Sequence, residues 1–299
     1  MENLRGSILM VLAMAGFALE DMFIKRLADA LPVGQIVIFL GFGGALIFGA
    51  ITMSQGRRLW SRDLLSRPVL LRNFGEIVGT LGFVTAIALT PLSSASAILQ
   101  ATPLAVTLGA ALFLGEAVGW RRWSAILVGF MGVLMVIRPG LEGFEPASLF
   151  AVQGVIGLAI RDLATRAVPR SISSMQLSTY AFATLVPTGL ILLAFSGTPA
   201  LPSGLNWRDL VLALLCGVAA YYAIVAAMRL GDVAVITPFR YSRLIFALII
   251  GVTLFDERPD VWTLTGAAII IASGIYTFWR ERRLARRSPA PSAPITPRG

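Results

Sequence analysis

The chain has 299 residues, of which 57% are hydrophobic and only 14% charged, and its net charge is +9. Because about a quarter of the residues of a soluble protein are charged, this composition excludes a soluble globular domain and predicts a membrane protein. The single cysteine excludes a disulfide within the chain, and the absence of histidine excludes metal sites and catalysis that need it, so we expect no metal, no cofactor and no enzymatic activity.

Apolar runs separated by short polar loops predict ten membrane helices and an all-α polytopic fold. The run from Ile77 to Gly115 contains no charged side chain and is about two spans long. We divide it at Thr90-Pro91, because proline disfavours helix at the residue before it. The expected helices cover about 5–27, 33–54, 68–90, 92–114, 120–138, 147–168, 173–195, 207–230, 232–255 and 260–281.

The two halves of the sequence resemble each other at one constant spacing. Glu116 and Glu257 lie 141 residues apart, each after an apolar run. The same spacing joins Gly16 to Gly157, Ala18 to Ala159, Asp21 to Asp162, Lys25 to Arg166, Gln35 to Gln176, Ala86 to Ala227 and Leu89 to Leu230. We therefore predict two five-helix repeats, 1–140 and 141–283, with a site between them, and a disordered proline-containing tail at 284–299.

The basic residues predict the orientation of the helices. With both termini on one side, 17 lysines and arginines fall on that side and five on the other. The positive-inside rule then places both termini in the cytoplasm, and an odd number of helices in each repeat inverts the second repeat. This pattern explains the positive charge without nucleic acid. The apolar N-terminal run ends on Glu20 and Asp21 without a cleavage pattern, so we expect a retained first helix, not a secretory signal.

A short pattern accompanies the repeat. Residues Thr102-Pro103-Leu104 open the second part of the fourth expected helix, which ends on Leu114-Gly115-Glu116, and the next helix has spaced glycines, Gly129 and Gly132. In this pattern the chain resembles the drug/metabolite transporter (DMT) superfamily, above all its EamA-type ten-helix exporters, and more narrowly the YddG-like amino-acid exporters. The resemblance implies efflux of small organic metabolites across a bacterial inner membrane. The second half departs from the pattern, since Leu244 stands where Pro103 maps and Asp256 replaces Gly115.

Several charged residues fall inside the expected spans, where each costs at least about 2.5–3.5 kcal/mol on insertion scales. They are Glu20, Asp21, Glu76, Arg161, Asp162, Arg240 and Arg243. We expect Arg240 and Arg243 to bind a substrate carboxylate and Glu76 to accept its ammonium group. The alternative is a structural ion pair between Glu76 and one of these arginines.

The remaining acidic residues have simpler explanations, with one exception. Asp21 and Asp162 precede Lys25 and Arg166 by four residues, which favours pairing along one helix. The alternative for them is a proton relay or gate. Glu20 has no such partner and stays a candidate substrate contact.

Aromatic and amide side chains at mid-span are expected to line a substrate cavity. They are Phe17, Gln100, Tyr221, Tyr222 and Tyr241, and we expect Gln100, Tyr241 and one of the adjacent tyrosines to face it. Pro103 and Pro238 are expected to act as hinges. Helix packing and fixed kinks are the alternatives.

The sequence thus predicts a secondary transporter that exports small organic metabolites, foremost aromatic or neutral amino acids, by alternating access around a central cavity. Its expected partners are a small-molecule substrate and the lipid bilayer, and we expect a monomer. One alternative is a multidrug or cationic-metabolite exporter of the same fold. A membrane enzyme acting on lipid-linked substrates is disfavoured by the lack of histidine, of an acidic cluster and of a sizeable loop.

Overall fold

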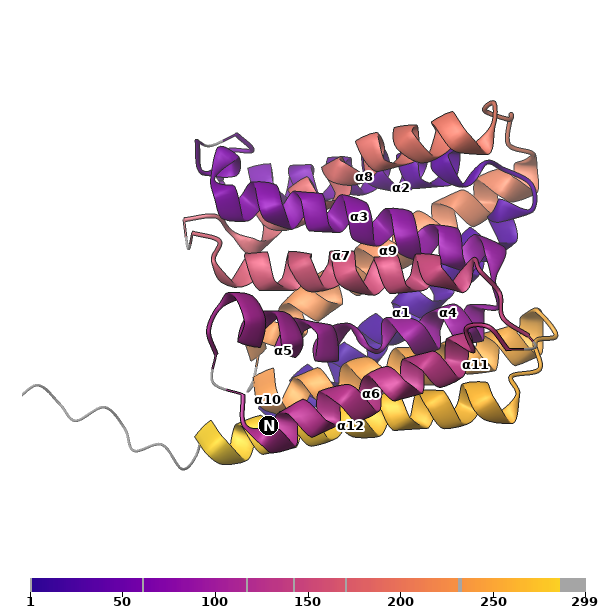
Figure 1. Cartoon of the computed structure of the whole chain (residues 1–299). Coiled ribbons are helices and arrows are strands. Elements are labelled where there is room, and N and C mark those ends of the chain that lie inside the picture. Colours follow the sequence, from indigo (N-terminus) through magenta and orange to yellow (C-terminus); the bar gives the residue numbers. More distant parts are fainter. Residues whose placement is uncertain are drawn as a thin grey trace, which may run out of the picture.

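A computed structural model describes residues 2–285 except 61, 117, 142, 170, 231 and 232. All regular structure in these residues is helical (Figure 1). The elements are α1 (Glu2–Ala28), α2 (Val33–Ser54), η1 (Arg62–Leu65), α3 (Arg67–Leu89), α4 (Leu92–Leu99), α5 (Thr102–Phe113), α6 (Trp120–Ile137), α7 (Ser148–Arg166), α8 (Ser174–Ser196), α9 (Gly204–Leu230), α10 (Val233–Ile236), η2 (Thr237–Tyr241), α11 (Ser242–Leu254) and α12 (Val261–Ala285).

Within the described residues, 10 helical segments are long and apolar enough to cross a membrane. This confirms the predicted all-α polytopic fold, and the predicted boundaries agree with the observed ones within a few residues. Residues 286–299 of the predicted tail lie outside the part of the chain that the structure describes.

Two of the predicted spans are broken near their middle. The fourth span divides into α4 and α5 at Gln100 and Ala101, just before Pro103, and the ninth passes through the 3-10 segment η2, which contains Pro238. Proline has no backbone N–H to continue the helix, so carbonyl groups are freed at each break. The Gln100 amide donates to the Tyr241 carbonyl at 3.0 Å, so a side chain from one break satisfies a carbonyl at the other.

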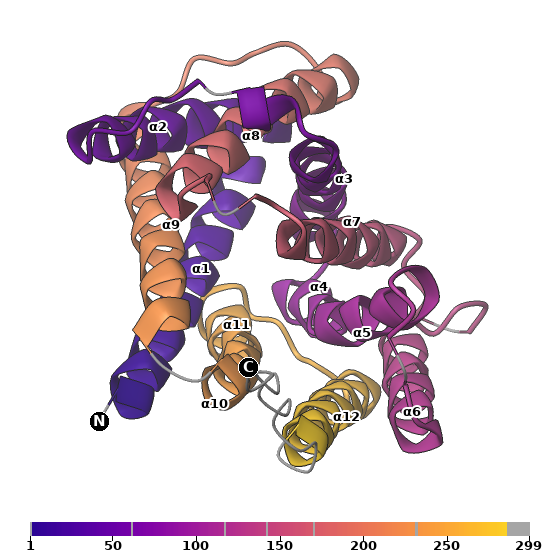
Figure 2. The ribbon, with the colours of Figure 1, turned by 90° about the vertical axis from the view of Figure 1, so that its left-hand side faces the viewer.

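Helices of the two halves pack against each other in pairs. The most extensive pairs are α1 with α9, α2 with α8, α3 with α7, and α6 with α12, and they surround the middle of the molecule in Figure 2. The 141-residue spacing maps α1 onto α7 and α3 onto α9, so the α1–α9 pair corresponds to the α7–α3 pair. The α2–α8 and α6–α12 pairs map onto themselves. This exchange is what two related repeats require.

Glycines bring α3 and α7 into backbone contact. A Cβ atom added to Gly157 would lie 2.1 Å from the Gly79 nitrogen, and one added to Gly75 would lie 2.6 Å from the Arg161 nitrogen. The Gly75-x-x-x-Gly79 face seen in the sequence therefore serves close helix packing. The same close approach places Glu76 of α3 beside Arg161 of α7.

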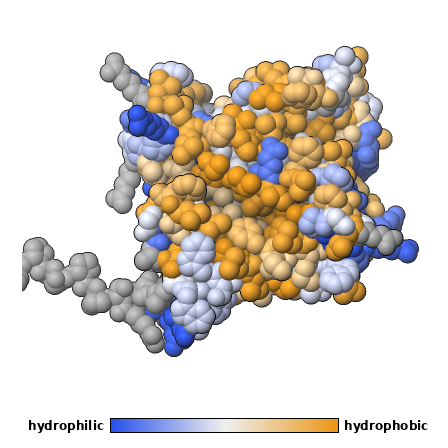
Figure 3. All heavy atoms as spheres, in the orientation of Figure 1, coloured by the Kyte–Doolittle hydropathy of each residue, from blue (hydrophilic) through white to orange (hydrophobic). Residues whose placement is uncertain are grey.

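The outer surface is that of a protein in lipid. Hydrophobic residues cover most of the face in Figure 3, and hydrophilic residues gather mainly toward its two ends. Large apolar side chains such as Phe113 (82% exposed) and Phe195 (88%) point outward. Such a surface suits an apolar solvent along the length of the helices.

We predict that Gly157→Ala destabilises the protein by about 1–3 kcal/mol, because the added methyl group would collide with the α3 backbone. The measurement is the midpoint of thermal unfolding of the purified protein in detergent. Gly204→Ala at the start of α9 is the matched control, since a Cβ there meets nothing within 4 Å. Equal midpoints for both variants would contradict the packing argument.

Candidate functional site

A cavity of about 560 Å³ lies between the two halves. Its walls come from α1, α2, α3, the α4–α5 break, α7, α8, α9, η2 and α11, whereas α6 and α12 contribute nothing. Among the residues that the structure describes, five arginines and four carboxylates line it, an excess of one positive charge. They are Glu20, Asp21, Arg72, Glu76, Arg161, Asp162, Arg229, Arg240 and Arg243.

Arg243 is held firmly by Asp21. Its Nε donates to Asp21 Oδ2 at 3.0 Å, and its Nη2 donates to Oδ1 at 2.8 Å and to Oδ2 at 2.7 Å. The guanidinium carbon also lies 5.1 Å from the ring centroids of Phe17 and Phe83. The Arg243 guanidinium is therefore already paired with a protein carboxylate, that of Asp21, which is only 2% exposed. The pair joins α1 of the first half to α11 of the second.

Glu76 is also occupied by protein groups. Arg161 Nη1 lies 3.3 Å from Glu76 Oε1, and Arg72 Nη2 lies 3.5 Å from Oε2. Because Glu76 lies between two guanidinium groups, the prediction that it accepts a substrate ammonium group has no support in this arrangement. The predicted alternative, an ion pair of Glu76 with Arg240 or Arg243, is wrong, since the partners are Arg72 and Arg161.

Arg72 is a buried arginine that the sequence analysis did not single out among the charged residues of the expected spans. It is 3% exposed in α3, and its Nη2 donates to the Tyr221 hydroxyl at 3.1 Å. The signal in the sequence is its position four residues before Glu76, which puts both side chains on one helix face.

Arg240 is the arginine least engaged by carboxylates at the centre of the cavity. Asp162 Oδ2 lies 3.8 Å from its Nη1, and that carboxylate also accepts a hydrogen bond from Arg161 Nε at 2.9 Å. The Arg240 side chain is 32% exposed, into the cavity. A charge-assisted hydrogen bond spans about 2.7–2.9 Å, so Arg240 retains donors for another partner.

Glu20 is the carboxylate that no described residue hydrogen-bonds. Its carboxylate lies over Gly217 of α9, where an added Cβ would come within 2.3 Å of Oε1. Its neighbour Asp21 takes the guanidinium of Arg243. Glu20 therefore faces the cavity with its acceptors available.

The predicted pairs along single helices are wrong. Lys25 donates to the Thr90 carbonyl at 2.6 Å, not to Asp21. Arg166 pairs with Glu116 at 2.9 Å, not with Asp162. Asp21 instead pairs with Arg243 of α11, and Asp162 pairs with its neighbour Arg161 and lies 3.8 Å from Arg240 of η2. Buried carboxylates gain more from dry, nearby guanidinium groups than from partners at the helix ends.

Of the two adjacent tyrosines, Tyr221 and not Tyr222 belongs to the cavity wall. Tyr221 lines the cavity, with its ring edge-on to Phe17, Phe48 and Phe182 at centroid distances of 6.5, 5.8 and 5.4 Å. Tyr222 is 52% exposed, lies outside the cavity lining, and faces the outer surface, since it is the next residue on the helix. Phe17 lines the cavity as well.

Gln100 and Tyr241 line the cavity, although their polar groups are directed elsewhere. The Gln100 amide donates to the Tyr241 carbonyl at the second helix break. The Tyr241 hydroxyl is buried against Gly274 of α12, without a hydrogen-bond partner among the described residues.

Pro103 lies in the cavity wall at the start of α5, and Pro238 lies in η2 at the second break. Their role as hinges stays a prediction.

The two ends of the cavity differ. At one end, the backbone N–H groups of Leu92 and Ser93 donate to the Glu257 carboxylate at 2.6 and 3.0 Å, so α4 is fastened to the end of α11. At the other end the lining reaches Thr165, Ser174 and Arg229. There α10 and α5, the repeat counterparts of α4 and α11, show no comparable packing in the described residues. One end is therefore fastened by a hydrogen-bonded cap, and the described residues show no equivalent contact at the other end.

A polytopic helical protein with a charged cavity between two related halves has the architecture of a secondary transporter. The sequence model of the EamA-like transporter family matches the chain twice, at residues 4–138 and 146–279. The protein belongs to this family, and thus to the DMT superfamily.

Relatives along nearly the whole chain carry transporter names. An S-adenosylmethionine uptake transporter of Rickettsia felis is 25% identical over 282 residues, covering 93% of each chain. A riboflavin transporter of Rhizobium johnstonii is 26% identical over 288 residues, covering 94% of this chain and 93% of its own. The pseudopaline exporter CntI of Pseudomonas aeruginosa is 28% identical over 282 residues, covering 90% of this chain and 94% of its own.

A solved crystal structure shares the fold. It superposes with a TM-score of 0.57 at 19% identity and covers 91% of this chain and 98% of its own. The match supports the arrangement of helices and says nothing about cargo.

We predict that Arg243→Gln destabilises the protein by about 3–5 kcal/mol, because it leaves the buried Asp21 carboxylate without its partner. The measurement is again thermal unfolding in detergent. Arg240→Gln is the matched control, since Arg240 is held by one carboxylate at 3.8 Å, and it should cost much less. Asp21→Asn in the Arg243→Gln background should recover part of the loss. An Arg240→Gln variant as unstable as Arg243→Gln would overturn this ranking.

Proposed function

We propose that the protein carries small zwitterionic solutes of the amino-acid class, foremost neutral and aromatic amino acids, through its central cavity by alternating access. Net flux is outward across a bacterial inner membrane, with both termini in the cytoplasm. The observation that supports this proposal is that Arg240 and Glu20 face one cavity with free hydrogen-bonding capacity, while the other central charges are paired with each other.

The cavity charges that retain hydrogen-bonding capacity define the chemistry of the proposed cargo. An α-carboxylate matches the guanidinium fork of Arg240, and an ammonium group matches the carboxylate of Glu20. The sequence-based assignment of the ammonium to Glu76 is thereby replaced by Glu20. Both ligand charges would be neutralised inside the membrane, which is the condition for carrying a zwitterion through a low-dielectric region.

The size and lining of the cavity suit such a cargo. A volume of about 560 Å³ falls within the range of small-molecule sites. The rings of Phe17 and Tyr221 provide an apolar wall for a side chain. The relatives are named for S-adenosylmethionine, riboflavin and pseudopaline, which are chemically diverse, so the cargo is argued here from the residues of this chain.

The unequal ends of the cavity support the proposal of alternating access. In this conformation Glu257 closes one end by capping α4. Its counterpart Glu116 has the same backbone environment, since the Glu116 and Glu257 N–H groups donate to the equivalent carbonyls of Ala110 and Gly251. Its side chain, however, pairs with Arg166. In the opposite conformation the Glu116 carboxylate would release Arg166 and close the cavity at the end where α10 lies. The Glu257 carboxylate would then release the start of α4.

We predict that Arg240→Gln lowers counterflow of phenylalanine or leucine in liposomes about tenfold or more, the value of one charge-assisted hydrogen bond. Competition with analogues assigns the contacts. The wild-type protein should reject amino-acid methyl esters and N-acetyl amino acids, Arg240→Gln should lose the discrimination against the ester, and Glu20→Gln should lose that against the N-acetyl compound. Tyr222→Ala, on the outer surface, is the control. Normal flux in both charge variants, or flux of lipophilic cations alone, would refute the proposed cargo.

We predict opposite effects for the two equivalent glutamates. With Cys216→Ser as background and a single cysteine at Thr80 in the cavity wall, an impermeant maleimide is added from the side of Glu257. Glu257→Gln should raise the labelling rate and Glu116→Gln should lower it, each about tenfold, because each change weakens one of two competing closures. Glu145→Gln, at an exposed position, is the control. Shifts in the same direction would refute the exchange of closures.

A further inference from the structure

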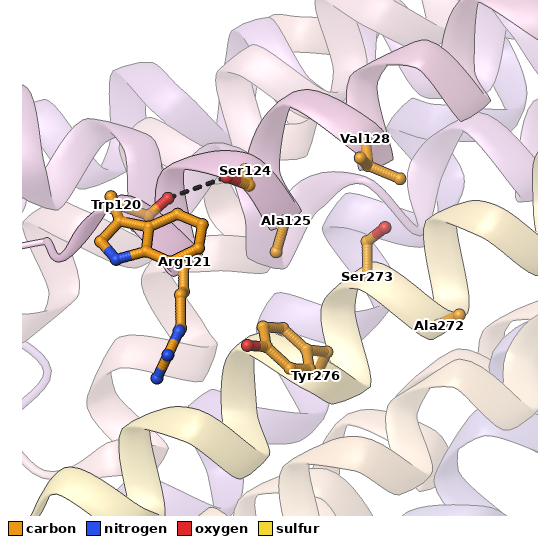
Figure 4. Close-up of a pocket in the computed structure, with 8 residues that line it drawn as sticks. All are labelled: Trp120, Arg121, Ser124, Ala125, Val128, Ala272, Ser273 and Tyr276. Carbon is orange, nitrogen blue, oxygen red and sulfur yellow. Dashed lines mark hydrogen bonds between the residues drawn. The ribbon is translucent and has the colours of Figure 1, made fainter.

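A second hollow lies on the outside of the protein, between the start of α6 and the end of α12. It measures about 400 Å³ and is lined by residues that the central cavity does not use. Figure 4 shows its polar side chains, Arg121, Ser124, Ser273 and Tyr276, together with Trp120 at its mouth. The proposed transport cycle assigns no task to this groove.

The groove arises from the way the two helices diverge. Further along, α6 and α12 touch through glycines, since a Cβ added to Gly132 would lie 2.8 Å from the Gly266 carbonyl oxygen. Toward the start of α6 the facing residues are the small Ala125 and Ala272, which do not fill the widening gap. The result is a wedge-shaped, largely apolar slot open to the surrounding lipid.

The polar groups of the groove retain hydrogen-bonding capacity. Within the described residues Arg121 pairs with no carboxylate, and its guanidinium carbon lies 5.2 Å from the Trp120 ring centroid. Ser273 is only 6% exposed, and its hydroxyl makes no hydrogen bond to the described residues. In Figure 4 this hydroxyl points into the space between the helices, and the Tyr276 hydroxyl points toward the Arg121 side chain.

The surroundings are those of a membrane interface. Tyr276 stacks near Trp279 with a centroid distance of 6.1 Å, and the guanidinium of Arg283 lies 5.3 Å from the Trp279 ring centroid. Tryptophan, tyrosine and arginine concentrate at the level of lipid headgroups. This end also carries the arginine-rich loops that predict the cytoplasmic side, whose leaflet holds anionic lipids.

We propose that this groove binds one anionic phospholipid. The phosphate lies between the Arg121 guanidinium and the Tyr276 hydroxyl. Ser273 lies three residues before Tyr276, which is about 4.5 Å deeper along the helix. Its hydroxyl donates to an ester carbonyl, which in a phospholipid follows just below the phosphate. One acyl chain fills the slot beside Ala125 and Ala272.

The charge of the site selects among lipids. Because Arg121 pairs with no carboxylate in the described part of the chain, its guanidinium favours a headgroup with net negative charge over a zwitterionic one, whose own ammonium group would meet Arg121. The buried Ser273 hydroxyl favours an ester lipid over a simple alkyl detergent, which has no acceptor at that depth.

Native mass spectrometry of the purified full-length protein tests the proposal with phosphatidylglycerol and phosphatidylcholine of identical acyl chains. The wild-type protein should bind one phosphatidylglycerol with about fivefold to tenfold preference. Arg121→Gln should abolish the preference, and Ala272→Phe, which plugs the slot without changing charge, should lower the binding of both lipids. Arg67→Gln, an exposed arginine at the start of α3, is the charge-matched control.

Three results would overturn the proposal: equal binding of the two lipids by the wild-type protein, the same loss in Arg67→Gln as in Arg121→Gln, or no effect of Ala272→Phe. Thermal unfolding of each variant shows whether it is folded. If Ala272→Phe does not fold, Ser273→Ala replaces it, and unchanged phosphatidylglycerol binding in that variant would overturn the assigned ester contact. Because none of these residues lines the central cavity, the outcome is independent of the proposed cargo.

Discussion

The structure depends on the free energy cost of keeping charged groups inside a membrane. A buried charge is tolerated where a partner neutralises it, and removing one partner costs far more than the pair contributes. Asp21 with Arg243, and Glu76 with Arg72 and Arg161, meet this condition. The pairs of Asp21 with Arg243 and of Glu76 with Arg161 join different helices, whereas Arg72 and Glu76 both lie in α3. The same constraint therefore contributes to the packing of the halves, and it leaves Glu20 and Arg240 as the groups that we propose a ligand neutralises.

The two helix breaks lie in the wall of the cavity. At Gln100 and at η2 the backbone departs from the α-helix, and irregular backbone in a membrane is tolerated where it is buried in protein or lines a polar cavity. The amide of Gln100, at the first break, donates a hydrogen bond to the carbonyl of Tyr241, at the second break, and so satisfies that carbonyl. Arg240 then enters the cavity from the irregular segment itself, which contains Pro238, the residue for which we predict a role as a hinge.

The fold could be predicted from the sequence because its signals are local. Long apolar runs predict spans, and one constant spacing between matching residues predicts two repeats. The pairing of charges could not be predicted in the same way. The spacing of Asp21 and Lys25 favours a pair along α1, but Lys25 lies near the closed end and bonds to the Thr90 carbonyl, while Arg243 approaches from α11. Which of two adjacent tyrosines faces inward likewise depends on how α9 is rotated about its axis, and that is set by its packing on α1.

The repeat explains why Glu20 remains available. The spacing of 141 residues maps Glu20 onto Arg161 and Glu76 onto Gly217. In the contact of α3 with α7, the two positions hold a carboxylate and a guanidinium, Glu76 and Arg161, which neutralise each other. In the equivalent contact of α9 with α1, the positions hold Gly217 and Glu20, so the carboxylate meets a bare backbone. Two equivalent contacts thus carry different chemistry: one stabilises the bundle, and the other leaves an acceptor in the cavity.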